Sequence, residues 1–87
     1  MEQMGGCLCG TVRYRVTKAP MAVSHCHCTV CRRASGAAFL TWMTLPAAAV
    51  AFITGEPAVY SSSPGIERLF CRQCGTSLRV RPKSLFI

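Results

Sequence analysis

The sequence contains no internal repeat, no linker and no amphipathic helix of ordinary length. These absences exclude a mainly helical fold and a chain of several domains. With 87 residues the chain forms one domain at most, and a domain this short has a thin hydrophobic core. Chains of this size often depend on disulfides or bound metal ions for their stability.

A secretory leader and a membrane span are also not expected. Residues 1–7 have neither a basic segment nor an apolar segment, so we expect no signal peptide and a cytoplasmic location. No charged residue occurs between Ala34 and Gly55, but Pro46 and several small polar residues interrupt this stretch. We therefore expect no contact with a membrane.

Acidic residues are scarce. The chain has 3 acidic and 10 basic residues, which gives a formal net charge of +7. Such an excess can indicate acidic partners such as nucleic acid. The arginines are scattered, however, there is no long basic arm, and metal-bound thiolates would lower the net charge. Binding to nucleic acid is therefore not the favoured prediction.

Short alternating segments predict an all-β fold. Within residues 11–16, Val12, Tyr14 and Val16 alternate with polar and charged residues, which indicates a half-buried strand. Residues 29–34 predict a single helical turn, and residues 46–49 are compatible with a short helix. Further strands are expected at residues 21–27, 38–45, 50–54, 58–61, 67–70 and 76–80. The expected total is six or seven short strands.

Seven cysteines occur in three clusters. They are a C-x-C (Cys7, Cys9), a C-x-C-x-x-C (Cys26, Cys28, Cys31) and a C-x-x-C (Cys71, Cys74). An odd number excludes complete internal disulfide pairing, and clustered thiols in a reducing compartment favour metal binding or catalysis. Zinc is the expected metal because the spacings do not match an iron–sulfur signature.

Ligand counting divides the seven thiolates into four and three. Four thiolates close a tetrahedral zinc site, whereas three leave a position for water or substrate. The simplest division joins the two-cysteine clusters into a closed site of Cys7, Cys9, Cys71 and Cys74. The remaining cysteines, Cys26, Cys28 and Cys31, would then form an open site. The total is two zinc ions per chain.

The C-x-C pair needs a local bend. Residues two apart on a strand are separated by about 6.6 Å, whereas sulfurs on one zinc ion are about 3.8 Å apart. We expect Gly5, Gly6 and Gly10 to permit that bend.

Two alternatives concern the ligands. A zinc ribbon would use Cys28, Cys31, Cys71 and Cys74, but it would leave three cysteines without a metal. His25 and His27 are the other candidate ligands. If Cys26 and Cys28 share one face of an extended segment, both histidines point to the opposite face. The simpler interpretation is that they lie beside the metal ligands or on the surface without binding the metal.

Residues 6–14, 24–32 and 70–76, which contain the three cysteine clusters, closely resemble the glutathione-dependent formaldehyde-activating enzyme family. This family also includes centromere protein V. The resemblance implies a β-tent fold of short antiparallel strands. It assigns Cys7, Cys9, Cys71 and Cys74 to a structural zinc ion, and Cys26, Cys28 and Cys31 to a catalytic zinc ion.

The resemblance also implies a carbon–sulfur lyase activity, the reversible condensation of formaldehyde with glutathione to S-hydroxymethylglutathione. Arg32 is a candidate partner for the glutathione carboxylates. Trp42 and Phe39 could line the pocket, although a place in the core is the simpler interpretation. A zinc module without catalytic activity, which binds protein or nucleic acid, is the alternative function.

The resemblance covers residues 1–87 as a single domain and implies that the family's C-terminal strands are missing. Their absence would leave a sheet edge exposed. Open edges favour pairing between chains, so we expect a homodimer.

Overall fold

The computed structural model describes residues 2–81 and 85–86, and most of its regular structure consists of short strands. The strands are β1 (Gln3–Gly6), β2 (Arg13–Val16), β3 (Ala22–Cys26), β4 (Leu40–Thr44), β5 (Val50–Thr54), β6 (Ala58–Ser63), β7 (Ile66–Phe70), β8 (Ser77–Arg81) and β9 (Leu85–Phe86). The helices are α1 (Thr29–Ser35) and a 3-10 turn, η1 (Ala47–Ala49). The predicted all-β class is confirmed.

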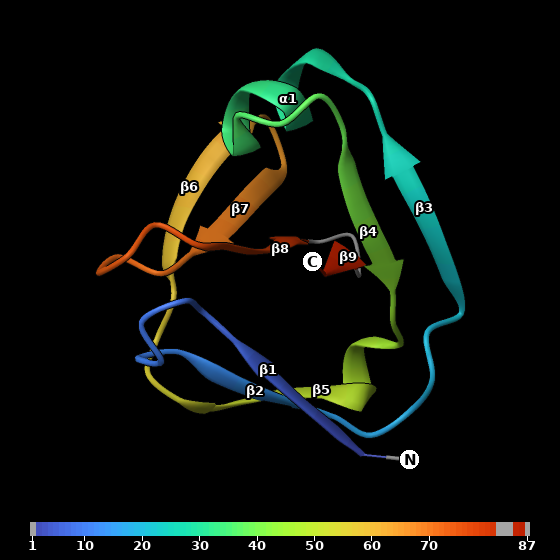
Figure 1. The fold of residues 1–87 in the computed structure, drawn as a ribbon, viewed down its shortest axis with the longest axis vertical. Helices are drawn as coiled ribbons and strands as arrows, with labels where there is room; N and C mark the ends of the chain where they lie inside the picture. Colours follow the sequence, from blue (N-terminus) through green and yellow to red (C-terminus); the bar gives the residue numbers. More distant parts are fainter. Residues whose placement is uncertain (1, 82–84, 87) are drawn as a thin grey trace.

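The strands form two antiparallel sheets that together make a tent. One sheet has three strands in the order β1-β2-β5, and the other has six in the order β3-β4-β9-β8-β7-β6. In Figure 1 the three-stranded sheet forms the base, β3 and β4 form one side, and β6 and β7 form the other. Helix α1 lies at the apex, where the two sides meet.

The main core lies over the three-stranded sheet. The predicted alternation in β2 is confirmed, because Val12, Tyr14 and Val16 are buried while Arg15 is exposed. Leu45 is fully buried in the same cluster, which also contains two of the cysteines. A second, smaller cluster joins Cys31, Trp42 and Val80 under the apex. Trp42 is therefore a core residue, as the simpler interpretation expected.

The predicted count of six or seven strands is too low, because β1 and β9 were not foreseen. Strand β1 contains Gly5 and Gly6, which have a low intrinsic preference for strands. Pairing with β2 imposes the extended conformation, and a Cβ at Gly5 would lie 2.5 Å from the Tyr14 ring. These glycines therefore permit close packing of β1 on β2, and they do not provide the bend that we expected beside the C-x-C pair.

The uncharged stretch from Ala34 to Gly55 is divided among several elements. It contains the end of α1, strand β4, the η1 turn and strand β5. Among the described residues, no helix combines the length and the apolar composition that are needed to cross a bilayer.

The small core makes stability sensitive to Leu45. Leu45→Ala should lower the free energy of unfolding by about 2–5 kcal/mol, because it removes a fully buried side chain and leaves a cavity. Ile53→Ala is the matched control, since Ile53 is 43% exposed and its truncation should cost less than about 1 kcal/mol. Urea unfolding of the metal-loaded proteins would measure both changes. Equal costs at the two positions would contradict this description of the core.

The homodimer remains a prediction. Within the described residues, β3 and β6 are the edge strands of the six-stranded sheet, and Val23 and Val59 on them are exposed. A sizing experiment at micromolar concentration should find a dimer. Val23→Lys or Val59→Lys should shift it toward monomer, because edge lysines oppose strand pairing. A strictly monomeric wild-type protein would contradict the prediction.

Candidate metal centres

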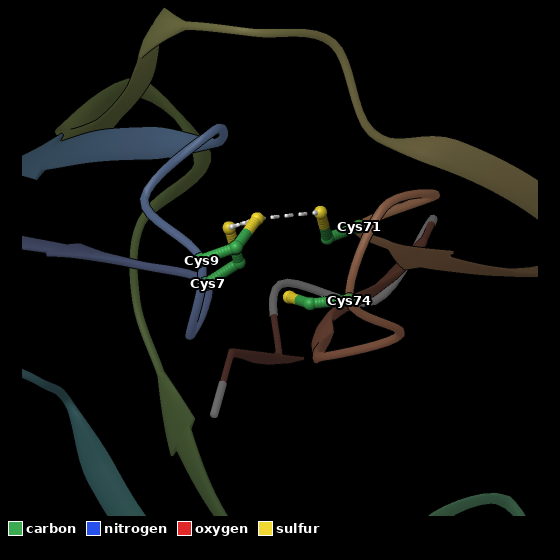
Figure 2. Close-up of side chains that lie close together, drawn as sticks. All are labelled: Cys7, Cys9, Cys71 and Cys74. Atoms are coloured by element: carbon green, nitrogen blue, oxygen red, sulfur yellow. Dashed lines mark hydrogen bonds between the residues drawn. The ribbon is translucent and has the colours of Figure 1, made fainter.

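Four cysteines from distant parts of the chain point toward one another (Figure 2). In this four-cysteine cluster, the Sγ atoms of Cys7, Cys9, Cys71 and Cys74 all lie within 4.8 Å of each other. The Cys7–Cys9 distance is 3.5 Å and the Cys9–Cys71 distance is 3.8 Å. Sulfurs around a tetrahedral zinc ion are about 3.8 Å apart, so this donor set fits a closed zinc site.

Two loops build the four-cysteine cluster. The first follows β1, where Gly10 adopts a positive φ of 83° and its N–H donates to the Cys7 carbonyl oxygen at 3.3 Å. The second follows β7, where the Gly75 N–H donates to the Cys71 carbonyl oxygen at 2.8 Å. The Leu8 N–H donates to the Thr76 hydroxyl at 3.1 Å and joins the loops. The cluster thus fastens the start of the chain to its last third.

Hydrogen bonds favour the thiolate form of two of these cysteines, Cys7 and Cys74. The Thr76 hydroxyl, 3.1 Å from Cys74 Sγ, is the main cause that lowers the pKa of Cys74 to about 5. The Val12 N–H donates to Cys7 Sγ at 3.2 Å and lowers the pKa of Cys7. Because the thiolate is the form that binds metal, these contacts prepare the sulfurs as ligands.

The remaining cysteines form a three-cysteine cluster at the apex. Cys26 ends β3, Cys28 is the N-cap of α1, and Cys31 lies in the helix. Their Sγ atoms lie within 4.8 Å of one another, and Cys26 and Cys28 are 3.4 Å apart. The Cys31 N–H donates to Cys28 Sγ at 3.2 Å, and this bond is the main cause that lowers the pKa of Cys28 to about 7. Burial raises the pKa of Cys31.

A cavity of about 540 Å³ opens beside the three-cysteine cluster. Its lining includes all three cysteines and a mixed set of polar and apolar side chains: Ser24, His25, His27, Val30, Trp42, Ser62, Ser63, Ile66, Arg68 and Val80. Three sulfur donors next to an accessible space match the arrangement of a metal site with an open coordination position. The four-cysteine cluster would leave no such position, because its four sulfur donors would complete the tetrahedral coordination of a zinc ion.

The two histidines lie outside both cysteine clusters. His25 Nδ1 is 3.0 Å from the Thr41 hydroxyl, and both imidazole rings pack against Phe39. Among the described residues, neither cysteine cluster includes a histidine as a further metal ligand. Phe39 is 43% exposed, so it is not the core residue that the simpler interpretation expected.

Sequence reasoning identified some of the residues beside the cavity and missed others. Arg32 is exposed on α1 and lies outside the described lining of the cavity, so its role remains a prediction. Arg68 was not singled out, yet its Nη2 lies 3.8 Å from Cys31 Sγ. Ser62 was missed as well. Both residues reach the cavity through strand pairing, for which the local sequence carries no signal.

The zinc-ribbon alternative does not fit this geometry. It would require Cys28 and Cys31 to share one metal with Cys71 and Cys74. The structure places the first pair at the apex with Cys26 and the second pair with Cys7 and Cys9. The geometry therefore favours two separate centres.

Comparison with known proteins identifies the family. The family model described as glutathione-dependent formaldehyde-activating enzyme matches residues 2–85. The chain belongs to this family, as the resemblance predicted.

Two relatives support this family assignment. A Schizosaccharomyces pombe protein named as an uncharacterized lyase is 33% identical over an alignment of 85 positions, and the match covers 88% of this chain and 56% of the relative. A Halomonas elongata protein, whose name assigns it provisionally to the glutathione-dependent formaldehyde-activating enzymes, is 32% identical over an alignment of 85 positions, and the match covers 87% of this chain and 54% of the relative. The chain thus spans about half the length of these relatives.

A solved structure shows the same fold. The crystal structure of a Rhodobacter sphaeroides protein superposes with a TM-score of 0.78 at 20% sequence identity, and the match covers 98% of this chain and 83% of that chain.

The two clusters predict two bound metal ions per chain, which contribute unequally to the stability of the fold. Cys28→Ser should lose one ion and keep the fold, because the apex cluster ties together nearby residues. Cys74→Ser should also lose one ion, but it should destabilise the protein by several kcal/mol, because a closed zinc site contributes on the order of 10 kcal/mol to folding. Elemental analysis and circular dichroism would measure these outcomes. A single ion in the wild-type protein would contradict the division.

Proposed function

We propose that the protein is a zinc-dependent carbon–sulfur lyase that joins the thiol of glutathione to formaldehyde, as an S-hydroxymethylglutathione synthase does. The observation that carries the proposal is the three-cysteine cluster, which offers three sulfur donors beside a cavity of about 540 Å³. Membership in the family and the names of the relatives supply the substrate class.

The two clusters take different roles in this proposal. Cys7, Cys9, Cys71 and Cys74 hold a structural zinc ion that stabilises the base of the tent. Cys26, Cys28 and Cys31 hold the catalytic zinc ion. A zinc ion with three protein ligands offers a further position to a thiol sulfur and favours its thiolate form.

The reaction forms one carbon–sulfur bond. The glutathione sulfur attacks the formaldehyde carbon, the carbonyl π electrons move to oxygen, and the oxygen takes up a proton. Overall, the proton that the thiol loses is balanced by the proton that the new hydroxyl group gains. His25 and His27 line the cavity and offer ring N–H groups as proton donors to that oxygen. Arg32 remains a proposed partner for a glutathione carboxylate. The buried Trp42 ring forms an apolar wall that limits the access of water.

A zinc module without catalytic activity is the second candidate. The net charge of +7 favours it, because such a charge attracts acidic partners. In that case the three-cysteine cluster would bind a metal ion but would neither bind a thiol ligand nor catalyse its reaction.

A thiol titration separates the two candidates. In cobalt-substituted protein, glutathione should change the visible absorption of the apex centre, whereas S-methylglutathione, which lacks the free thiol, should not. Cys31→Ala should abolish the response because it removes one of the three donors. Carbon-13 NMR with labelled formaldehyde should then detect S-hydroxymethylglutathione forming faster with the wild-type protein than without it. A visible absorption spectrum that does not change when glutathione is added would contradict the lyase proposal.

A further inference from the structure

We propose that Arg68 and Ser62 form a carboxylate-binding subsite next to the three-cysteine cluster, so that the centre selects thiols that carry a carboxylate. This inference rests on the proposed function, since it assumes that a thiol binds at the cluster. It assigns carboxylate recognition to a strand at the side of the tent, where sequence reasoning had pointed to Arg32 on the helix.

Arg68 lies at the middle of β7, directly opposite Tyr60 on β6 and Val80 on β8. Residues directly opposite each other point to the same face of a sheet, and Val80 lines the cavity at the apex. The Arg68 side chain therefore projects toward the cluster, and its Nη2 lies 3.8 Å from Cys31 Sγ. Arg68 also lines two further cavities, of about 420 and 370 Å³.

No acidic side chain neutralises Arg68. The chain has only three acidic residues. Glu67 alternates to the other face of β7 and pairs with Arg81 at 2.8 Å, and Glu2 pairs with Arg15 at 3.7 Å. Glu56 lines a different cavity. The three cavities that Arg68 lines contain no carboxylate among the described residues, so no acidic side chain there competes with the carboxylate of a ligand for Arg68.

Two buried polar atoms in this region lack a partner. The Nε of Arg68 and the Oγ of Ser62 are buried and make no hydrogen bond within the described part of the chain. Buried polar atoms are almost always hydrogen-bonded, so each one requires an explanation. Arg68 and Ser62 together line both the 540 Å³ and the 420 Å³ cavity. A carboxylate would accept from both groups, and a guanidinium matches its geometry.

Strand alternation places Ser62 on the same face as Arg68. Ser62 is two residues after Tyr60, which lies directly opposite Arg68, and residues two apart on a strand share a face. Ser61 pairs with Glu67 and Ser63 pairs with Ile66, so a β-bulge leaves Ser62 without a residue opposite it on β7. Such bulges are frequent beside functional sites. Ser62 lines the cavity together with Arg68.

The short distance between Arg68 and Cys31 limits the size of the ligand. The guanidinium is already within 3.8 Å of a cluster sulfur. A thiol held by the cluster and a carboxylate held by Arg68 must therefore be separated by only a few bonds. The preferred ligands are small mercaptocarboxylates such as 3-mercaptopropionate.

The test compares two ligands that differ only in charge. 3-Mercaptopropionate and its neutral amide have the same length and the same thiol. Both should change the visible spectrum of the cobalt-loaded protein, and both should change the fluorescence of Trp42, the only tryptophan, which lines the cavity. The wild-type protein should bind the acid at least about tenfold more tightly, because bonds between charged groups are strong. Arg68→Met should remove this preference while the amide affinity changes less than about threefold.

Matched variants complete the design. Arg15→Met, which replaces an exposed arginine on β2, should keep the preference, and Arg68→Lys should keep part of it, since lysine retains the charge but not the planar fork. Ser62→Ala should weaken the binding of the acid and leave the binding of the amide unchanged. If Arg68→Met does not fold, the ligand pair on wild-type protein and Ser62→Ala decide the question.

Three results would overturn the inference. Equal affinity of the wild-type protein for the acid and the amide would contradict the carboxylate subsite but would be compatible with the proposed function. A preference that survives Arg68→Met but is lost in Arg32→Met would move the recognition to the helix. If neither ligand changes the cobalt spectrum, both the subsite and the proposed function fail.

Discussion

The convergence of four cysteine sulfurs from two ends of the chain is the contact on which the rest of the structure depends. The loop after β1 and the loop after β7 are separated by more than sixty residues, yet Cys9 and Cys71 lie 3.8 Å apart. A chain of 87 residues has only a thin core. Four thiolates in such proximity repel one another unless a cation lies between them, so the cluster and the fold of the base require each other.

Strand β7 connects the two centres. Its first residue, Ile66, lines the cavity at the apex, and Cys71 of the four-cysteine cluster follows directly after its last residue. Arg68 lies between them and projects toward Cys31. A metal ion bound by the four-cysteine cluster would therefore also limit the movement of the strand that carries Arg68. In the proposed function, this ion would in that way support the site of the chemistry.

Much of the fold could be predicted from the sequence, because local patterns and ligand counting carry the information. The alternation in β2 gave its buried face correctly, and the division of seven cysteines into four and three matches the two groups in the structure. Strand β1 could not be foreseen, since pairing with β2 overrides the low strand preference of Gly5 and Gly6. Arg68 and Ser62 could not be foreseen because long-range strand pairing brings them to the cavity.

Anomalous diffraction at the zinc edge, from crystals of the metal-loaded protein, would show how many ions each chain holds and which sulfurs bind them. We expect two peaks per chain. One should lie about 2.3 Å from the Sγ atoms of Cys7, Cys9, Cys71 and Cys74, and the other at the same distance from those of Cys26, Cys28 and Cys31. A single peak bound by Cys28, Cys31, Cys71 and Cys74 would contradict this expectation.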